Sequence, residues 1–447
     1  MVAIITDYFK REFVQQVLND VADSASNYYI GIGRSQDWNE TDTPTTPTNT
    51  TKDERDFRLN MQSVKKIEDV SFVAPRYNWA SGSIYASYNN AQAGYATNPH
   101  YVITDNNSVY ICLQQAKSSS GAAQPSTVKP TGSLTVPFKT ADGYVWKFLY
   151  TLSAADANRF LSANYIPVKK ILSTDGSSSA NDIEQESIQN AASVGQIGSI
   201  AVTSGGTGYT STPTVTIVGN GTLAEATATI SSGAVVKIDI RDSDSTVLNG
   251  SGYQFANIVL SGGGGTGAAA RANIAPSGGF GADSRIDLKS TAVMFNAKPD
   301  ADEGGDFIIG QDFRQVGLIK NPLVPVTDSD YTAATGSALN RMTLTTVSTT
   351  FTADKIIRGA TSDAVAYVDR FDSDTIYYHQ TLETGFTAFE AGETVSEDDG
   401  AGSGTINNPL LSGDINKFSG EVFYIDNRAS IERSAGQTED LKIVIQL

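Results

Sequence analysis

Residues 144–150 read YVWKFLY, and this stretch indicates the fold class. Its side chains are almost all aromatic or aliphatic, it contains neither Gly nor Pro, and its length is typical of a buried strand. Residues 28–33 (YYIGIG) and 109–113 (VYICL) have the same character. Because most of the remaining chain alternates in the same way between short apolar runs and turns, we predict a mainly β fold with a few helices, of the α+β class.

Three helices are predicted from apolar spacing and capping residues. Phe9, Phe13 and Val17 recur at intervals of four, which places them on one face of a helix near the start of the chain. A second helix is expected over residues 53–67, and a third is expected to begin at Ser153. We expect all three to be core helices.

The length and the charge of the chain limit its function. The 447 residues allow two to four domains, and 32 basic against 49 acidic residues give a net charge of −17. Such a charge repels nucleic acids and anionic membranes, so we predict no nucleic-acid partner. The chain contains no apolar run long enough for a secretory signal or a membrane span. We therefore expect a soluble protein that is made in a cytoplasm and is not inserted in a membrane.

The glycine-rich region 176–284 contains an internal repeat. The sequence GGTGY at 205–209 recurs as GSGY at 250–253, and AEATATI at 224–230 recurs as AAARANI at 268–274. Both recurrences have the same offset of 44 residues. Glycines permit tight reversals between short strands, so the region is predicted to be a compact β module of two related units.

Two further regions have a distinctive composition. Residues 331–411 return to alternating strands, of which MTLTTV at 342–347 is the clearest, and they predict a second small β domain. Residues 41–51 (TDTPTTPTNTT) cannot form a core, and we expect them to be an exposed excursion.

Residues that usually carry catalysis or bind metals are scarce. The chain has two histidines, His100 and His379, and one cysteine, Cys112, which stands in an apolar strand and is predicted to be a small buried hydrophobe. The acidic runs 300–306 and 242–245 lack the ligand pattern of a calcium loop, so both are interpreted as solvated loops. We predict no catalytic residue, no metal site and no cofactor.

Five segments, followed by QTED at 437–440, together resemble one family. They are YIGIGRSQDW at 29–38, VAPRYNW at 73–79, DGYVWKFLY at 142–150, FRQVGLIKNPL at 313–323 and GEVFYIDNR at 420–428. In this order they resemble the baseplate wedge subunit of T-even-like contractile-tailed phages, the gene product 8 family.

The resemblance implies a β-sandwich body interrupted by two inserted β-rich modules. It does not extend over the repeat region or the region of alternating strands, and we interpret these two as the insertions. The expected organisation is wedge body at 1–175, repeat module at 176–284, wedge body at 285–330, second β domain at 331–411 and C-terminal strands of the body at 412–447.

The resemblance also implies a function without catalysis. A protein of this family is a homodimer in the tail baseplate of the virion, is synthesised in the host bacterial cytoplasm and contacts other wedge subunits. Contacts with tail fibres or fibre adaptors would be compatible with this place. Two alternatives stay open: a receptor-binding or fibre-attachment virion protein that uses the inserted glycine-rich modules, and a tail-associated glycan hydrolase, although no carboxylate pair is positioned for hydrolysis.

The matched segments supply the candidate interface residues. Their arginines stand in turns or at strand ends, where a guanidinium can tie loops together or face a partner. The three tryptophans of the chain all lie in matched segments, and we assign Trp146 to the core and the other two to either the core or an interface. The candidate interface residues are Arg34, Trp38, Arg76, Trp79, Arg314, Asn427 and Arg428.

Overall fold

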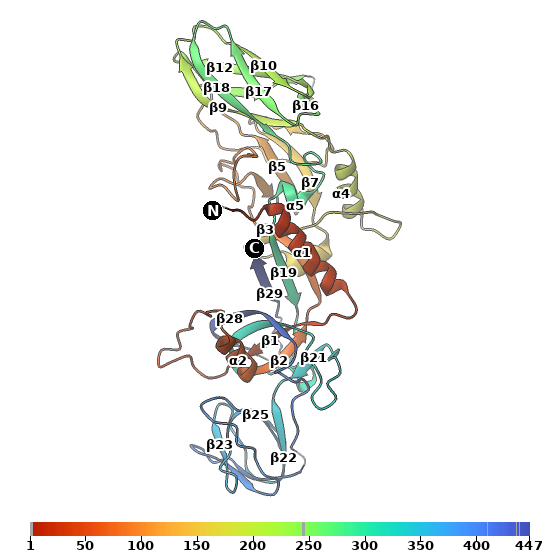
Figure 1. The fold of residues 1–447 in the computed structure, drawn as a ribbon, viewed down its shortest axis with the longest axis vertical. Helices are drawn as coiled ribbons and strands as arrows, with labels where there is room; N and C mark the ends of the chain where they lie inside the picture. Colours follow the sequence, from red (N-terminus) through yellow and green to blue (C-terminus); the bar gives the residue numbers. More distant parts are fainter. Residues whose placement is uncertain (1–2, 244–245, 409, 435, 438) are drawn as a thin grey trace. The chain divides into compact units, whose positions relative to one another are not determined.

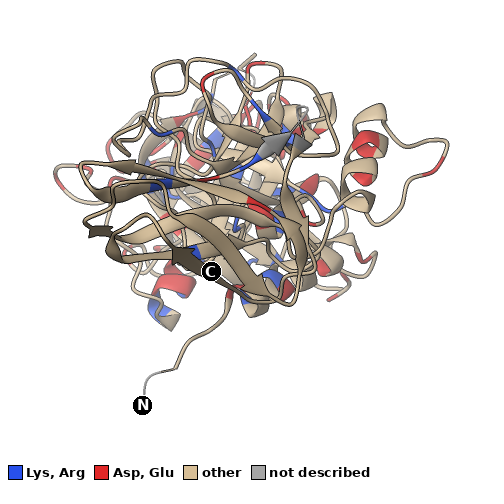
Figure 2. Ribbon diagram, turned by 90° about the horizontal axis from the view of Figure 1, so that it is seen from above, with Lys and Arg blue, Asp and Glu red and all other residues tan. Residues whose placement is uncertain are grey.

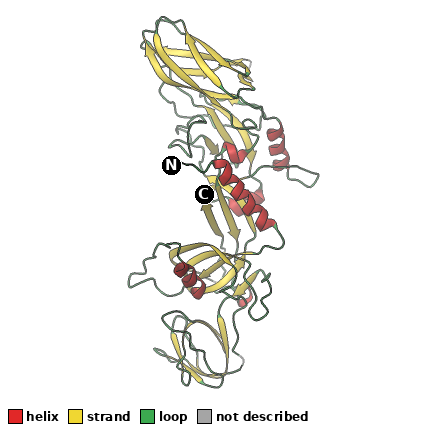
Figure 3. Ribbon diagram, viewed as in Figure 1, coloured by secondary structure: helices red, strands yellow, loops and turns green. Residues whose placement is uncertain are grey.

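A computed structural model describes residues 3–243, 246–408, 410–434, 436–437 and 439–447 (Figure 1). Strands make up 40% of the chain and helices 12% (Figure 3), which confirms the prediction of a mainly β fold with a few helices. Within the described ranges, no helix is both long and apolar enough to cross a membrane. Part of the acidic run 242–245 (residues 244 and 245) and residue 438 of the matched segment 437–440 lie outside the described residues.

The chain forms two compact units, each assembled from segments that are distant in sequence. The first consists of Met1–Gln15, Ser71–Met294 and Val444–Leu447, and the second of Gln16–Val70 and Phe295–Ile443. The predicted repeat module at 176–284 falls in the first unit, and the predicted β domain at 331–411 falls in the second. The chain passes from one unit to the other within four secondary-structure elements: α1 (Asp7–Ala22), β3 (Asp69–Pro75), β19 (Ala292–Ala297) and β29 (Leu441–Gln446).

The core of the first unit is built on an antiparallel four-stranded sheet. Trp146 is fully buried, and its ring stacks on Tyr144 at 5.6 Å between centroids, as expected for a core residue. Cys112 is buried in the neighbouring strand, as predicted. The strand order is β4 (Tyr101–Ile103), β5 (Ser108–Gln114), β7 (Val145–Thr151) and β6 (Phe138–Lys139).

The remaining elements around this core include short helices. The Ser153 hydroxyl accepts a hydrogen bond from the Asp156 amide and caps α3 (Ala154–Phe160), so the third helix begins where the sequence predicts. In the first unit, β3 pairs with β8 (Tyr165–Val168) from Phe72 to Pro75. This unit also contains α4 (Ala180–Asn190), α5 (Ser284–Asp287) and the first part of α1.

The repeat region forms a sheet of its own within the first unit. Its six strands have the order β10 (Thr214–Gly219), β17 (Ala256–Ser261), β18 (Thr266–Ile274), β9 (Ile197–Thr207), β13 (Ala234–Ile240) and β12 (Ala226–Ser231). Two short ribbons accompany it, formed by β11 (Thr222–Ala224) with β16 (Asn249–Ser251) and by β14 (Asp242–Ser243) with β15 (Thr246–Val247).

The two repeats of this module are related by a local twofold. In the antiparallel pair β10–β17, Val215 lies opposite Leu260 and Thr216 lies opposite Val259. The offset of 44 residues makes Val215 equivalent to Val259 and Thr216 equivalent to Leu260. Replacing each residue by its equivalent therefore converts one pair into the other. A pairing that maps onto itself in this way requires a twofold axis between the two strands.

The tyrosines of the repeat obey the same twofold. The ring of Tyr209 lies against Gly265, where a β-carbon would come within 2.4 Å of it, and the ring of Tyr253 lies against Gly221 with the same 2.4 Å. Each repeat thus places its aromatic ring on a glycine of the other. Both tyrosines are buried, so the two units stabilise each other and neither has a complete core alone.

This interlock predicts equal effects of two distant mutations. Tyr209→Ala and Tyr253→Ala should each lower the local unfolding free energy of the module by about 3 kcal/mol, because each leaves a cavity over a glycine. Hydrogen exchange of β10 and β17 measures this loss. Phe255→Ala is the control, since Phe255 is 64% exposed and its removal should cost less than about 0.5 kcal/mol. Markedly unequal losses for the two tyrosines would contradict the twofold.

The second unit contains a five-stranded antiparallel sheet and a closed barrel. The sheet has the order β21 (Thr335–Ser337), β2 (Met61–Lys66), β1 (Tyr28–Gly33), β20 (Asp312–Lys320) and β28 (Glu421–Glu432). The barrel has the order β22 (Asn340–Thr349), β25 (Thr375–His379), β24 (Val365–Asp372), β23 (Ile356–Gly359), β26 (Thr394–Glu397) and β27 (Ser403–Ile406). The predicted strand at 342–347 lies within β22.

The predicted helix over 53–67 is wrong in its second half. Helix α2 (Thr51–Asn60) begins at a capping box in which the Thr50 side chain accepts from the Asp53 amide. The chain then continues as β2, whose first four residues are all buried. Val64 pairs with Gly31 of β1, and Gly336 of β21 occupies its other side. Apolar residues at 61 and 64 satisfy a buried strand as well as a helix face, so the spacing could not distinguish the two.

The prediction that the first helix is a core helix is also wrong for its aromatic face. Phe9 is 61% exposed and Phe13 is 51% exposed. The buried residue of α1 is Val14. The periodicity correctly predicts a helix. It does not reveal that Phe9 and Phe13 stay largely exposed while Val17 is partly covered.

Candidate functional site

The loop after β1 positions Arg34. Strand β1 ends in a bulge at Gly33, and a β-carbon at this position would lie only 2.1 Å from the Asn60 carbonyl oxygen. The Arg34 amide donates to that same carbonyl at 3.0 Å, and Arg34 has a φ of 63°, in the left-handed region. This strained turn directs the chain away from the sheet and fixes where the Arg34 side chain begins.

Arg34 and Trp38 form a stacked pair within that loop. The guanidinium carbon lies 4.2 Å from the centroid of the Trp38 ring, a cation–π geometry. One guanidinium nitrogen of Arg34 donates to the Asp37 carbonyl at 3.0 Å, and burial lowers the pKa of Arg34 below its usual value. The indole Nε1 of Trp38 donates to the Arg428 carbonyl at 2.7 Å, which ties the loop to β28.

Arg314 is the centre of the network. It lies at a register shift between β20 and β28, and such a bulge redirects a side chain out of its regular place on the strand. Only 6% of the side chain is exposed. Its guanidinium donates to the Ser35 carbonyl at 2.5 Å, to Asp37 at 2.6 Å and to Asp42 at 2.7 Å. The bond from Arg314 lowers the pKa of Asp42. One buried arginine therefore holds three points of the loop.

Asn427 and Arg428 complete the network on β28. The Asn427 amide donates to the Thr45 carbonyl at 2.8 Å, and its oxygen accepts from Gln315 at 2.9 Å. The Arg428 side chain is 55% exposed and pairs with Asp426 at 2.6 Å. The excursion predicted at 41–51 is mostly exposed, and its inner side is anchored through these contacts.

Five of the seven candidate residues thus converge in the second unit, and the other two belong to the first. Arg76 donates to Asn78 at 2.9 Å and to the Ser162 carbonyl at 2.8 Å. Trp79 is half-buried beside the aromatic core, and its indole donates to Ser126 at 3.1 Å. In the folded chain, these two side chains tie local loops together.

A pocket of about 490 Å³ opens beside Arg34 and Trp38. The loop after β1 and helix α2 supply one side of it, including Lys52 and Asp56. The other side comes from the barrel, through Tyr367 of β24 and the segment after β25, Thr381, Leu382 and Glu383. The sequence does not predict that the barrel residues line this pocket, because they lie more than 300 positions from Arg34 and carry no motif.

The two histidines are buried and carry structural hydrogen bonds. His379 and Asp369 are completely buried and are joined at 2.5 Å, and the far nitrogen of His379 lies 3.2 Å from Gln36, which lines the pocket. In the first unit, His100 lies 3.0 Å from the Asp287 carbonyl, and burial lowers the pKa of His100 to about 4.

One residue of the acidic run 300–306 forms an ion pair with a lysine of β2. Glu303 accepts from Lys65 of β2 at 2.6 Å, and both side chains are largely buried. Across the described ranges, no group of three His, Cys, Asp or Glu side chains is arranged to hold a metal ion.

No family model matches this chain, and no curated protein matches it.

The buried position of Arg314 predicts a large effect of its removal. Arg314→Met should destabilise the sheet by about 3 kcal/mol, because it leaves the acidic loop without its cation in a partly buried place. Arg428→Met removes an exposed pair and should cost less than about 1 kcal/mol. Hydrogen exchange along β20 in increasing urea compares the two variants, and equal effects would contradict the central role of Arg314.

Asp287 predicts a pH dependence in the first unit. It is fully buried, accepts one hydrogen bond from the Gly281 amide at 2.9 Å, and its burial raises its pKa to about 8. A raised folded-state pKa stabilises the fold below the unfolded value near 4, and this contribution disappears as the pH rises through about 8. The stability of Asp287→Asn relative to the wild type should therefore increase steadily with pH across that window.

Other groups near Asp287 titrate in the opposite sense. Burial lowers the pKa of Lys147 to about 8, so its contribution grows above that pH, and that of His100 grows between about 4 and 6.5. The charge of Asp287 also raises the pKa of Lys147, so the difference in unfolding free energy between the two proteins is assigned to Asp287 only between about pH 4 and pH 7, below the pKa of Lys147. A difference that does not vary with pH would show that Asp287 is not protonated in the folded state.

Proposed function

We propose that the chain is a structural subunit of the baseplate wedge of a contractile phage tail. It holds wedge subunits together and transmits conformational change when the tail attaches to a host. The supporting observation is that three segments of the family resemblance, 29–38, 313–323 and 420–428, form the neighbouring strands β1, β20 and β28. Their ends form a single hydrogen-bonded network around Arg314, although residues 39–312 separate the first segment from the second.

The regions outside the resemblance support the same proposal. The repeat region folds as a six-stranded sheet with an internal twofold, and residues 340–406 close into a barrel with its own apolar cluster. Each has its own strand order and needs no strand from the five-stranded sheet. This is the behaviour expected of modules inserted into a body.

The surface chemistry is compatible with protein partners. Acidic and basic residues are interspersed over the ribbon (Figure 2), and the net charge of −17 favours partners with basic patches. In this proposal the chain is a homodimer of the virion baseplate, made in the host cytoplasm. Its partners are other wedge subunits and tail fibres or fibre adaptors, it binds no nucleic acid, and it catalyses no reaction.

A receptor-binding or fibre-attachment role is the second candidate. The large apolar side chains that are most exposed in the repeat module, among the residues described, are Leu223 at 81% and Phe255 at 64%, and a partner could cover them. This role would use the inserted module and leave the five-stranded sheet as a scaffold.

The native mass of the purified protein distinguishes the two candidates. Sedimentation velocity should give a dimer, about twice the 47.4 kDa of one chain. A trimer would contradict the wedge proposal and favour the fibre role, because fibres are generally trimeric.

A further inference from the structure

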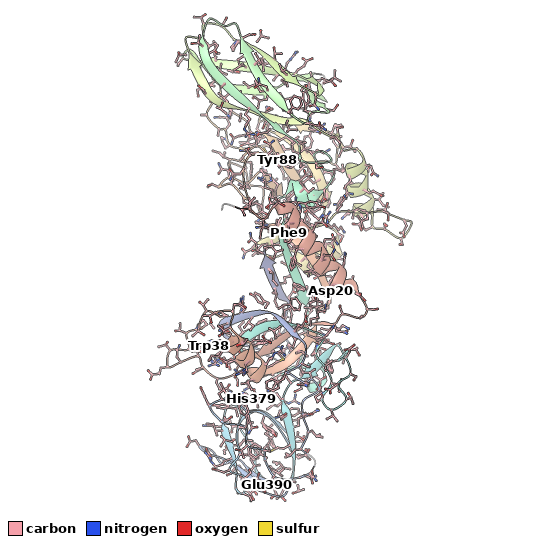
Figure 4. All side chains as sticks on the ribbon, viewed as in Figure 1. Phe9, Asp20, Trp38, Tyr88, His379 and Glu390 are labelled. Atoms are coloured by element: carbon pink, nitrogen blue, oxygen red, sulfur yellow. The ribbon has the colours of Figure 1, made fainter. Side chains whose placement is uncertain are left out.

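We propose that the pocket beside Trp38 binds a neutral saccharide. The inference is independent of the proposed place in a baseplate, because it rests on the chemistry of the pocket lining. The pocket has about 490 Å³, within the usual range for sites that hold a small organic ligand. Trp38 lies on its sheet side, and His379, which contacts the pocket-lining Gln36, lies towards the barrel (Figure 4).

The charges of the lining select a ligand without net charge. Lys52 is paired with Asp56 at 2.5 Å, and Asp37 is paired with Arg314 at 2.6 Å. The lining then has one further residue of each charge, Arg34 and Glu383. Their charges attract each other, although the two side chains do not form an ion pair. With Asp37 neutralised by Arg314, the lining is left with two carboxylates and two basic groups, so neither an anion nor a cation is favoured.

The hydrogen-bonding groups of the lining select a ligand with several hydroxyls. The Arg34 guanidinium is a hydrogen-bond donor, and its buried Nε has no acceptor among the described residues. The Glu383 carboxylate is an acceptor, and it already accepts a hydrogen bond from the Tyr367 hydroxyl at 3.3 Å. A hydroxyl is both donor and acceptor, so a polyol can satisfy both sides at once. Leu59 and Leu382 are the aliphatic side chains of the lining, which is too little apolar surface for a hydrophobic ligand.

Two aromatic rings distinguish a saccharide from a simple polyol. Trp38 and Tyr367 both line the pocket, from the sheet side and the barrel side. Each is anchored: Trp38 by its bond to the Arg428 carbonyl, and Tyr367 by stacking on His379 at 5.6 Å. A sugar ring has an apolar face of C–H groups and a rim of hydroxyls, which matches anchored aromatic rings between polar side chains.

Titration of the full chain with neutral sugars tests the proposal. Glucose, galactose, N-acetylglucosamine and their short oligomers are added at millimolar concentrations, and binding is followed by calorimetry and by tryptophan fluorescence. At least one series should bind, and Glu383→Gln should weaken it about tenfold, because a charge-assisted hydrogen bond is lost. Oligomers that bind more tightly than single sugars would indicate a surface glycan as the source, and equal affinities would indicate a free sugar.

The control is a second exposed carboxylate of the same barrel. Glu390 lies outside the pocket at the end of the barrel away from Trp38 (Figure 4), so Glu390→Gln should leave the affinity unchanged. Tyr367→Ala is the second pocket variant and should also weaken binding, with circular dichroism to confirm the fold. The proposal is overturned if no neutral sugar binds, if both Gln variants bind equally well, or if a peptide occupies the pocket and sugars do not displace it.

Discussion

The second unit depends on the packing of one aromatic ring over two glycines. Gly31 of β1 and Gly317 of β20 lie opposite each other, and Phe57 of α2 covers the pair. A β-carbon at Gly317 would lie 2.3 Å from the Phe57 ring, so a larger residue there would lift α2 off the sheet. Because α2 carries the end of the loop that begins at Arg34, this contact also fixes that loop against the network of Arg314.

Much of the strand content could be predicted from local sequence. Strands at 28–33, 109–113 and 144–150 are buried on both faces, so their aromatic and aliphatic runs are a direct signal. The repeat could also be predicted, because it is found by comparing the chain with itself. The errors occurred where burial depends on tertiary contacts: residues 61–66 became a strand, and the aromatic face of α1 stayed exposed.

The candidate site was predictable only in part. Five candidate residues, from Arg34 to Arg428, converge because they lie in or shortly after β1, β20 and β28, which are neighbouring strands of one sheet. Asp42 could not be assigned as a partner of Arg314, since it lies in a polar excursion 272 positions away. The pocket needed the barrel as well, because Tyr367 and Glu383 contact it only after residues 340–406 have closed.

If the chain is a wedge subunit, it belongs to the tail of a contractile phage, and its localisation in purified tails tests this central claim most directly. Gold-labelled antibodies raised against the closed barrel should mark the baseplate of every tail, before and after contraction, if the chain is a wedge subunit. Label along the fibres or at their tips, or particles that carry no label, would contradict this account of its function.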